Sequence, residues 1–161
     1  MTNILEKIIT DKKDSIKMYK DSFTIEYLNK KISSYEKYLD FKAKLMEKKV
    51  SVIAEIKKAS PSAGIIIQNY DPKIIAKQYL DSGATCLSVL TEEKHFQGQL
   101  EHIKEIKDEV KLPVLCKDFF IDPYQVYLAK SFGADAILII LAVIEEKIAK
   151  EIYDVANKLN I

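Results

Sequence analysis

One pattern of helix and strand signals occurs twice in this chain, and it limits the fold more than any other feature. The stretch DPKIIAKQYLDSGATCLSVL at 71–90 resembles DPYQVYLAKSFGADAILII at 122–140. Each begins with Asp-Pro, which favours a helix start, and reaches Gly-Ala, where glycine favours the helix end. An apolar strand follows. Helices that alternate with apolar strands predict a parallel α/β sheet.

The same alternation extends over the whole region from residue 50 onward. We expect strands over Val50–Ile56, Ala84–Leu90, Pro113–Cys116 and Asp135–Leu141, and helices over 71–83, Gly98–Glu109, 122–133 and Ile144–Leu159. The repeat spans two strand–helix modules, which favours a (βα) barrel, where alternate strands have equivalent roles. A doubly wound sheet is the structural alternative. It usually carries a G-x-G-x-x-G turn after its first strand, and the sequence has none.

The region before Pro61 contains neither glycine nor proline, and its first 47 residues are rich in Lys, Glu, Ile, Leu and Tyr. Apolar residues recur there at helical spacing in two groups, which predicts two helices with a break near residues 21–24. The groups are Ile4, Leu5, Ile8 and Ile9, and Tyr35, Tyr38, Leu39 and Leu45. We therefore divide the chain into an N-terminal helical extension at 1–48 and an α/β unit at 49–161.

Composition narrows the classes of function. The net charge of +1 gives no electrostatic reason to expect a nucleic acid or membrane partner. Cys86 and Cys116 lie in apolar runs without metal or redox spacing, as expected of buried, reduced thiols in a cytoplasmic protein. The longest apolar run, 136–144, is far shorter than the roughly 20 residues of a membrane-spanning helix. His95 and His102 lack partners at metal-ligand spacing, and we expect both at the surface and no metal site.

Two charges stand at the end of the first expected strand. Residues two apart share a face of a strand, so Glu55 and Lys57 point the same way as Ile53, while the alternate residues are all apolar. The apolar face should meet the helices. The charged face should then meet the barrel interior at the carboxyl end of the strand, where barrels carry active sites. The alternative is an ion pair that satisfies only itself, but buried pairs of that kind are poor stabilisers.

Lys117 repeats this arrangement as the last residue of the third expected strand, while Cys116 should face the helices. A solvated lysine at a strand end is the alternative. Lys57 and Lys117 aimed into one pocket would suit an anionic substrate. Desolvation and mutual repulsion would lower the pKa of a lysine there, which is how lysine becomes a general acid–base group. The serine-rich loop 60–64 and the loop 91–98 follow strands at the same mouth.

Four motifs together resemble the indole-3-glycerol-phosphate synthase family. They are AEIKKASPSAG at 54–64, SVLTEEKHFQGQ at 88–99, LPVLCKDFFIDPYQV at 112–126 and GADAILII at 133–140. The resemblance is collinear and covers the whole chain. It implies a TIM (βα)8 barrel, with the first four βα units present here, and an N-terminal segment over the catalytic mouth.

The resemblance also implies a carboxy-lyase of tryptophan biosynthesis that uses no metal or organic cofactor. Its substrate, 1-(2-carboxyphenylamino)-1-deoxyribulose 5-phosphate, is an anionic small molecule with a carboxylate and a phosphate. Ring closure with loss of carbon dioxide and water gives indole-3-glycerol phosphate. Lys117 matches the general acid, Lys57 the lysine that pairs with the carboxylate, and Glu55 the glutamate that orients them. The positions matched to substrate binding are Ser60 at the mouth and Phe96, Phe119 and Leu138 around the anthranilate ring.

The chain departs from the family pattern at residues 157–161, where it ends before a fifth strand. We therefore expect a fragment that holds the acid end of the chemistry and lacks most of the phosphate-binding loops. Its open sheet edges would favour self-association. Two other interpretations stay open: another phosphate-substrate barrel of the same pathway, such as phosphoribosylanthranilate isomerase, and a non-catalytic half-barrel that associates with a partner chain.

Overall fold

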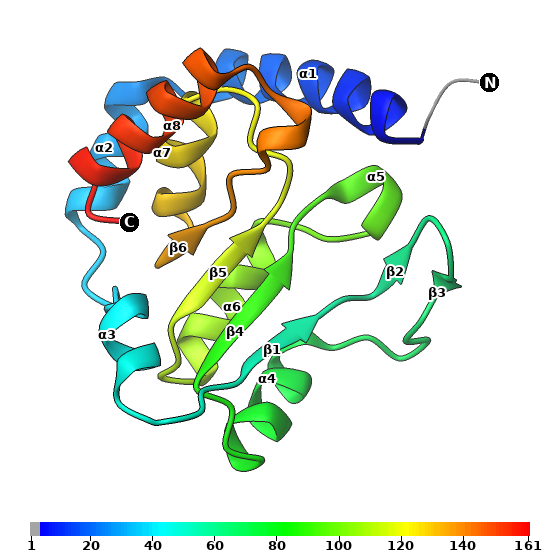
Figure 1. Cartoon of the computed structure of the whole chain (residues 1–161), viewed down its shortest axis with the longest axis vertical. Helices are drawn as coiled ribbons and strands as arrows, with labels where there is room; N and C mark the ends of the chain where they lie inside the picture. The colour runs from blue at the N-terminus through cyan, green and yellow to red at the C-terminus, as the bar shows by residue number, and fades with distance from the viewer. Residues whose placement is uncertain (1–3) are drawn as a thin grey trace.

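The computed structural model describes residues 4–161 and shows a parallel sheet with helices packed against it (Figure 1). The sheet consists of β1 (Ile53–Ile56), β4 (Cys86–Leu90), β5 (Val114–Lys117) and β6 (Ala136–Ile137), paired in this order and all parallel. A doubly wound sheet would reverse its strand order at a switch point. The sequential order therefore agrees with the winding of a TIM barrel, and the expected parallel α/β sheet is confirmed.

The helices that follow these strands begin and end where local chemistry favours it. They are α4 (Pro72–Asp81), α6 (Glu101–Glu109), α7 (Tyr124–Ser131) and α8 (Glu146–Lys158). The Asp71 carboxylate caps α4 by accepting from the next backbone N–H groups, and Asp122 accepts from the first N–H of α7 at 2.8 Å. Gly83 and Gly133 follow these two helices with φ of +86° and +98°. Both glycines adopt the left-handed conformation that the sequence predicts at these helix ends.

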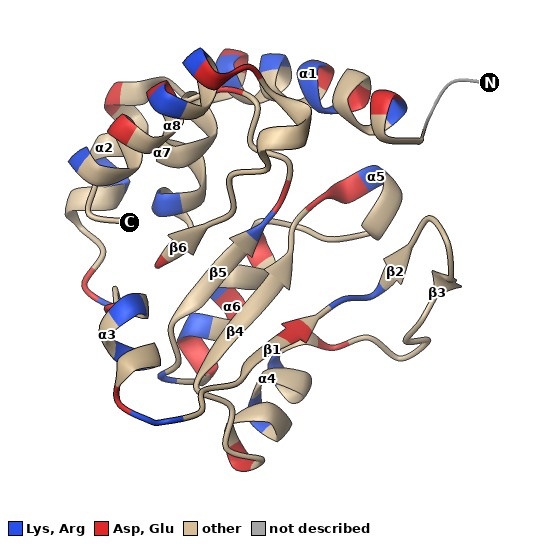
Figure 2. Ribbon diagram, in the orientation of Figure 1, with Lys and Arg blue, Asp and Glu red and all other residues tan. Residues whose placement is uncertain are grey.

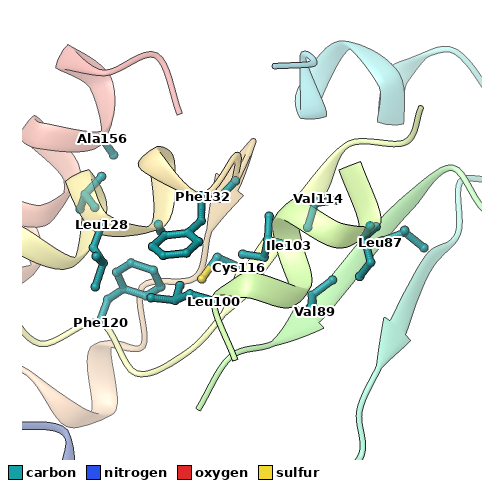
Figure 3. Close-up of a cluster of buried hydrophobic side chains, with 14 of the residues drawn as sticks. Leu87, Val89, Leu100, Ile103, Val114, Cys116, Phe120, Leu128, Phe132 and Ala156 are labelled. Carbon is teal, nitrogen blue, oxygen red and sulfur yellow. The ribbon is translucent and has the colours of Figure 1, made fainter. Parts of the chain in front are cut away.

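The helix-facing side of the sheet forms the centre of the hydrophobic core. Ile56, Leu87, Val89 and Val114 have no exposed surface, and they alternate with residues on the opposite face. Figure 3 shows three of them beside Ile103 of α6, within a cluster that continues to α7 and α8. Burial of such side chains contributes on the order of 2 kcal/mol each. The prediction that the apolar face meets the helices is confirmed.

Both cysteines are buried, as the sequence predicts, but on opposite faces of the sheet: Cys116 lies on the helix side, whereas Cys86 shares the face of Ser88 and lies against Phe41. Cys86 and Cys116 are free thiols and both are buried. Burial raises the pKa of the Cys86 thiol to about 11 and that of Cys116 to about 12. The protonated thiol is therefore the form that this environment favours.

Before β1 the chain forms α1 (Ile4–Ser22), α2 (Ile25–Ser33) and α3 (Phe41–Met46). The break between the first two helices falls where predicted, and Thr24 caps α2. The predicted continuation of helix through residues 35–40 is wrong. There the Tyr38 hydroxyl donates to the Lys130 carbonyl and the Leu39 N–H donates to the Asp135 carboxylate, so tertiary contacts replace helical hydrogen bonds. The first three residues of the expected extension lie outside the described residues.

The predicted strand over 135–141 is shorter in the structure. Only Ala136 and Ile137 pair with β5, and a 3₁₀ turn, η1 (Leu141–Val143), follows. The partner strand ends at Lys117, so residues beyond 138 have no neighbour on that side to continue the ladder. The run that was expected to be buried is instead half-buried over 136–140, and Leu141 is exposed.

Two loops at the carboxyl ends of strands contain structure of their own. The serine-rich loop is the turn of a two-stranded hairpin, β2 (Ala59–Ser60) and β3 (Gly64–Ile65). The loop after β4 contains a short helix, α5 (Glu93–Phe96), and the helix expected from residue 98 begins at Glu101. Both segments project from the sheet at the end where the strands finish (Figure 1).

A buried ion pair joins the last strand to the helix layer. Lys107 of α6 donates to Asp135 at 2.6 Å, and the two side chains are 1% and 0% exposed. Asp135 also accepts from the Val114 N–H of β5 at 2.8 Å. Burial lowers the pKa of the Lys107 ammonium, and the neighbouring Asp135 carboxylate opposes this shift. The pair therefore fixes the start of β6 against β5 and α6.

Replacing Asp135 by alanine should lower the free energy of unfolding by about 3–5 kcal/mol, because it leaves a buried ammonium without its partner. Urea unfolding followed by circular dichroism measures the change. The matched control is Asp108→Ala, which breaks an exposed pair between Lys37 and Asp108, with side chains 54% and 51% exposed. That change should cost less than about 1 kcal/mol. Equal losses in the two variants would contradict a structural role for the buried pair.

Candidate active site

Three charged residues meet at the carboxyl end of the sheet. The Glu55 carboxylate accepts from Lys57 Nζ at 2.6 Å through Oε1 and from Lys117 Nζ at 3.0 Å through Oε2. Figure 2 shows the acidic segment of β1 and the basic end of β5 at the same end of the sheet. One carboxylate thus holds two ammonium groups, and the cluster carries one net positive charge suited to an anionic ligand.

The register of the sheet explains how residues 62 positions apart come into contact. Strands β1 and β5 lie on either side of β4, and Glu55 pairs across the sheet with Ser88, which pairs with Leu115. A serine is the small residue in this row, so the longer charged side chains can reach over β4. Sequence reasoning did not single out Ser88. Its signal was present as a small polar residue inside the apolar strand CLSVL.

The cluster is accessible to a ligand. The side chains of Glu55 and Lys57 are each 33% exposed, and that of Lys117 is 36% exposed. Partial burial of Glu55 acts to raise the pKa of its carboxyl, but hydrogen bonds from the two lysines outweigh this effect and the pKa lies below its ordinary value. Glu55 therefore favours the ionised form that keeps both ammonium groups in place.

Two aromatic residues lie together on neighbouring loops at this end of the sheet. Phe96 ends α5 in the loop after β4, and Phe119 lies two residues beyond β5; their ring centroids are 6.4 Å apart. Leu138 directly follows β6 and is half-buried. Ser60 lies in the hairpin, where its hydroxyl accepts from the Ala63 N–H at 3.2 Å. The structure therefore brings the two phenylalanines together, whereas Ser60 stabilises its own turn.

A second set of polar residues lies between α1 and the ends of β4 and β5, and it was not predicted from the sequence. Asp118 directly follows β5 and is buried; it forms an ion pair at 2.8 Å with Lys12 of α1. The Thr91 hydroxyl donates to the same carboxylate at 2.9 Å. The signal was a lysine on an otherwise apolar helix stripe, since Ile8 and Ile16 on either side of Lys12 are also buried.

Both histidines are less exposed than predicted. His102 lies on α6, is buried and packs against the Tyr70 ring at 5.4 Å between centroids, so its predicted surface position is wrong. The His95 side chain is 12% exposed, and its Nε2 lies 2.8 Å from Asp11 of α1. The prediction failed because spacing along the chain does not reveal α1 packing over the loop that carries His95.

The loop after β4 closes on itself at Gly98. The Gly98 N–H donates to the Glu92 carbonyl at 2.8 Å. A Cβ atom at this position would lie 2.2 Å from the Leu90 carbonyl oxygen, closer than any side chain can approach. Glycine is therefore required here by contact with the strand end, and the loop 91–98 has a fixed path. This path places Phe96 beside Phe119.

Within residues 4–161, His, Cys, Asp and Glu side chains form no group of three or more that could hold a metal ion. Over the same residues, no helix combines the length and apolar character needed to cross a bilayer.

The parallel sheet and the cationic cluster at its carboxyl edge define the class: an α/β protein of the TIM-barrel type with a site suited to an anion. A family model described as indole-3-glycerol phosphate synthase matches residues 5–161. The chain belongs to this family.

Curated relatives with the same description come from several organisms. The protein of Trichodesmium erythraeum (strain IMS101) is 45% identical over 159 residues, which is 98% of this chain and 54% of that protein. Those of Acaryochloris marina (strain MBIC 11017) and Microcystis aeruginosa (strain NIES-843 / IAM M-2473) are 45% and 44% identical over 147 residues, or 90% of this chain and 48% and 50% of the relatives. The chain thus spans about half the length of the curated relatives it matches.

Replacing Lys117 by methionine should raise the pKa of the Glu55 carboxyl, because the change removes a cationic hydrogen-bond donor that favours the ionised form. Titration of the Glu55 side-chain carboxyl by ¹³C NMR measures this shift. Lys57→Met should act in the same direction. Lys111→Met, at an exposed position before β5, should leave the titration unchanged. An unshifted Glu55 titration in both cluster variants would contradict the hydrogen-bonded arrangement.

Proposed function

We propose that this chain supplies the proton-donating part of an indole-3-glycerol phosphate synthase, a carboxy-lyase of tryptophan biosynthesis. The substrate is 1-(2-carboxyphenylamino)-1-deoxyribulose 5-phosphate, an anionic small molecule. The observation that carries the proposal is the cluster of Glu55, Lys57 and Lys117 at the carboxyl edge of a parallel sheet. Membership of the family supports it.

Lys117 is the general acid in this proposal. The ring carbon that bears the substrate carboxylate attacks the ketone carbon, and the ketone oxygen takes a proton from the Lys117 ammonium as the new carbon–carbon bond forms. Carbon dioxide is then lost, and elimination of water completes the indole. An ammonium held at the end of a strand is available to the substrate from the open face of the sheet.

Lys57 and Glu55 prepare the site for this step. Lys57 pairs with the substrate carboxylate and takes part in the later proton movement. Glu55 keeps the two ammonium groups close together, since it accepts from Lys57 at 2.6 Å and from Lys117 at 3.0 Å. Without this carboxylate the two ammonium groups would repel each other.

The apolar residues near the cluster enclose the anthranilate ring in this proposal. Phe96 and Phe119 form one wall, and Leu138 at the end of β6 extends it. A wall of low polarity strengthens the interaction between Lys57 and the substrate carboxylate, because less water competes for the charges. In this proposal Ser60 contributes to the substrate mouth; it belongs to the hairpin that follows β1.

We propose that residues 1–48 form a helical extension and residues 49–161 form the first four βα units of a (βα)8 barrel. The curated relatives are about twice the length that this chain matches. In this proposal the remaining units close the barrel against the edges at β1 and β6 and supply the phosphate-binding loops. Closure would also cover exposed residues of the β1 segment, such as Val52 at 54% and Ile53 at 45% exposure. We place the enzyme in the cytoplasm.

Combining the chain with the matching carboxyl-terminal part of a relative should restore turnover of the substrate to indole-3-glycerol phosphate, measured by the fluorescence of the indole product. Lys117→Ala should then lower kcat by about 10²–10⁴-fold, because the general acid is lost. Lys111→Ala, at an exposed lysine three residues before β5, is the matched control and should keep full activity. Undiminished turnover with Lys117→Ala would rule out the assigned acid. Turnover of phosphoribosylanthranilate instead would favour the alternative barrel of the pathway.

A further inference from the structure

Helix α1 contacts both loops that carry the paired phenylalanines. It runs across the end of the sheet where the strands finish (Figure 1). Two consecutive residues of this helix reach different loops: Asp11 bonds to His95 in the loop after β4, and Lys12 bonds to Asp118 after β5. His95 directly precedes Phe96, and Asp118 directly precedes Phe119.

The contact through Lys12 is buried, and the Asp118 carboxylate in it accepts several hydrogen bonds. Lys12 Nζ lies 2.8 Å from Asp118 Oδ1 and 3.0 Å from Oδ2, and each side chain is 8% exposed. Asp118 also accepts from the Thr91 hydroxyl at 2.9 Å and from the Phe119 N–H at 2.7 Å. The carboxylate therefore connects the helix, the start of the β4 loop and the backbone of Phe119.

The contact through Asp11 acts on the other loop. Asp11 Oδ2 lies 2.8 Å from His95 Nε2, and Asp11 Oδ1 accepts from Lys94 Nζ at 2.8 Å. The same segment is held from inside by the Glu92 carboxylate, which accepts from the N–H groups of His95 at 2.7 Å and Phe96 at 3.1 Å. The position of the Phe96 backbone thus depends on contacts at both sides of α5.

Stability alone does not account for a charged pair at this position. Buried ion pairs are often replaced by apolar residues with no loss of stability. Lys12 lies between the buried residues Ile8 and Ile16, so an apolar side chain would continue the stripe. What an apolar residue would not supply is a fixed bond to the carboxylate next to Phe119.

We propose that Asp11 and Lys12 are positioning residues that set the spacing of Phe96 and Phe119, and with it the affinity of the site for an aromatic substrate. This inference rests on the proposed function, because it takes the two rings as the wall of the substrate site. The ring centroids lie 6.4 Å apart at an interplanar angle of 42°. Loss of the contact between α1 and either loop increases the distance between the two rings. It therefore raises KM for the substrate more than it lowers kcat.

The direct test measures the ring spacing in the 161-residue chain, independently of catalysis. Nuclear Overhauser effects between the Phe96 and Phe119 ring protons should be present in the parent chain, lost in Lys12→Met and retained in Lys12→Arg, which keeps the charge. Lys13→Met, an exposed lysine beside it on α1, is the matched control and should retain them. Asp11→Asn removes the negative charge from the second contact at a partly exposed position and should weaken them, and it decides the question if Lys12→Met does not fold.

The second measurement uses the chain completed with the carboxyl-terminal part of a relative. Lys12→Met and Asp11→Asn should each raise KM by about tenfold, with kcat changed by less than about threefold, because binding rather than chemistry is affected. Unchanged ring contacts in the folded variants, the same losses in Lys13→Met, or an unchanged KM despite lost ring contacts would overturn the proposal. If the completed parent chain shows no turnover, the proposed function fails, while the ring contacts still decide whether α1 sets the spacing.

Discussion

Burial of one face of the parallel sheet determines where the charged side chains at the strand ends point. Ile56, Leu87, Val89 and Val114 are withdrawn completely from solvent on the helix side. Side chains alternate along a strand, so this burial fixes the orientation of the residues between them. Glu55 and Lys117 therefore project from the opposite face. A slip of one residue in either strand would bury a charge among the helices, and the cost of that burial protects the site.

The parts of the structure that follow from local chemistry were predicted from the sequence. Asp-Pro and Gly-Ala mark the ends of α4 and α7 by capping and by left-handed backbone, and the period of two placed Glu55 and Lys57 on one face. These signals act within a few residues, so one sequence contains them completely. The contact between Lys57, Glu55 and Lys117 also follows from the pleat, once the strands are known to be parallel.

What the sequence did not reveal depends on contacts between distant segments. The segment at residues 35–40 has helical spacing, yet bonds from Leu39 to Asp135 and from Tyr38 to Lys130 hold it in an irregular path. The buried pair of Lys12 and Asp118 joins residues 106 positions apart, and His95 is covered by the same helix. Lys12 interrupts an apolar stripe between Ile8 and Ile16, but the sequence does not show what this lysine contacts until the packing of α1 is known. The residue types alone gave no reason to connect it to the site.

The requirement for glycine at position 98 limits how the loop after β4 can move. A hydrogen bond from the Gly98 N–H to the Glu92 carbonyl joins the two ends of the loop, and Gly98 packs directly against the Leu90 carbonyl. A loop anchored in this way can tilt on its base, but it has little freedom to change its internal shape. Glu93, Lys94, His95 and Phe96 would then travel together. Displacement of the outer surface of this loop would therefore also displace the Phe96 ring.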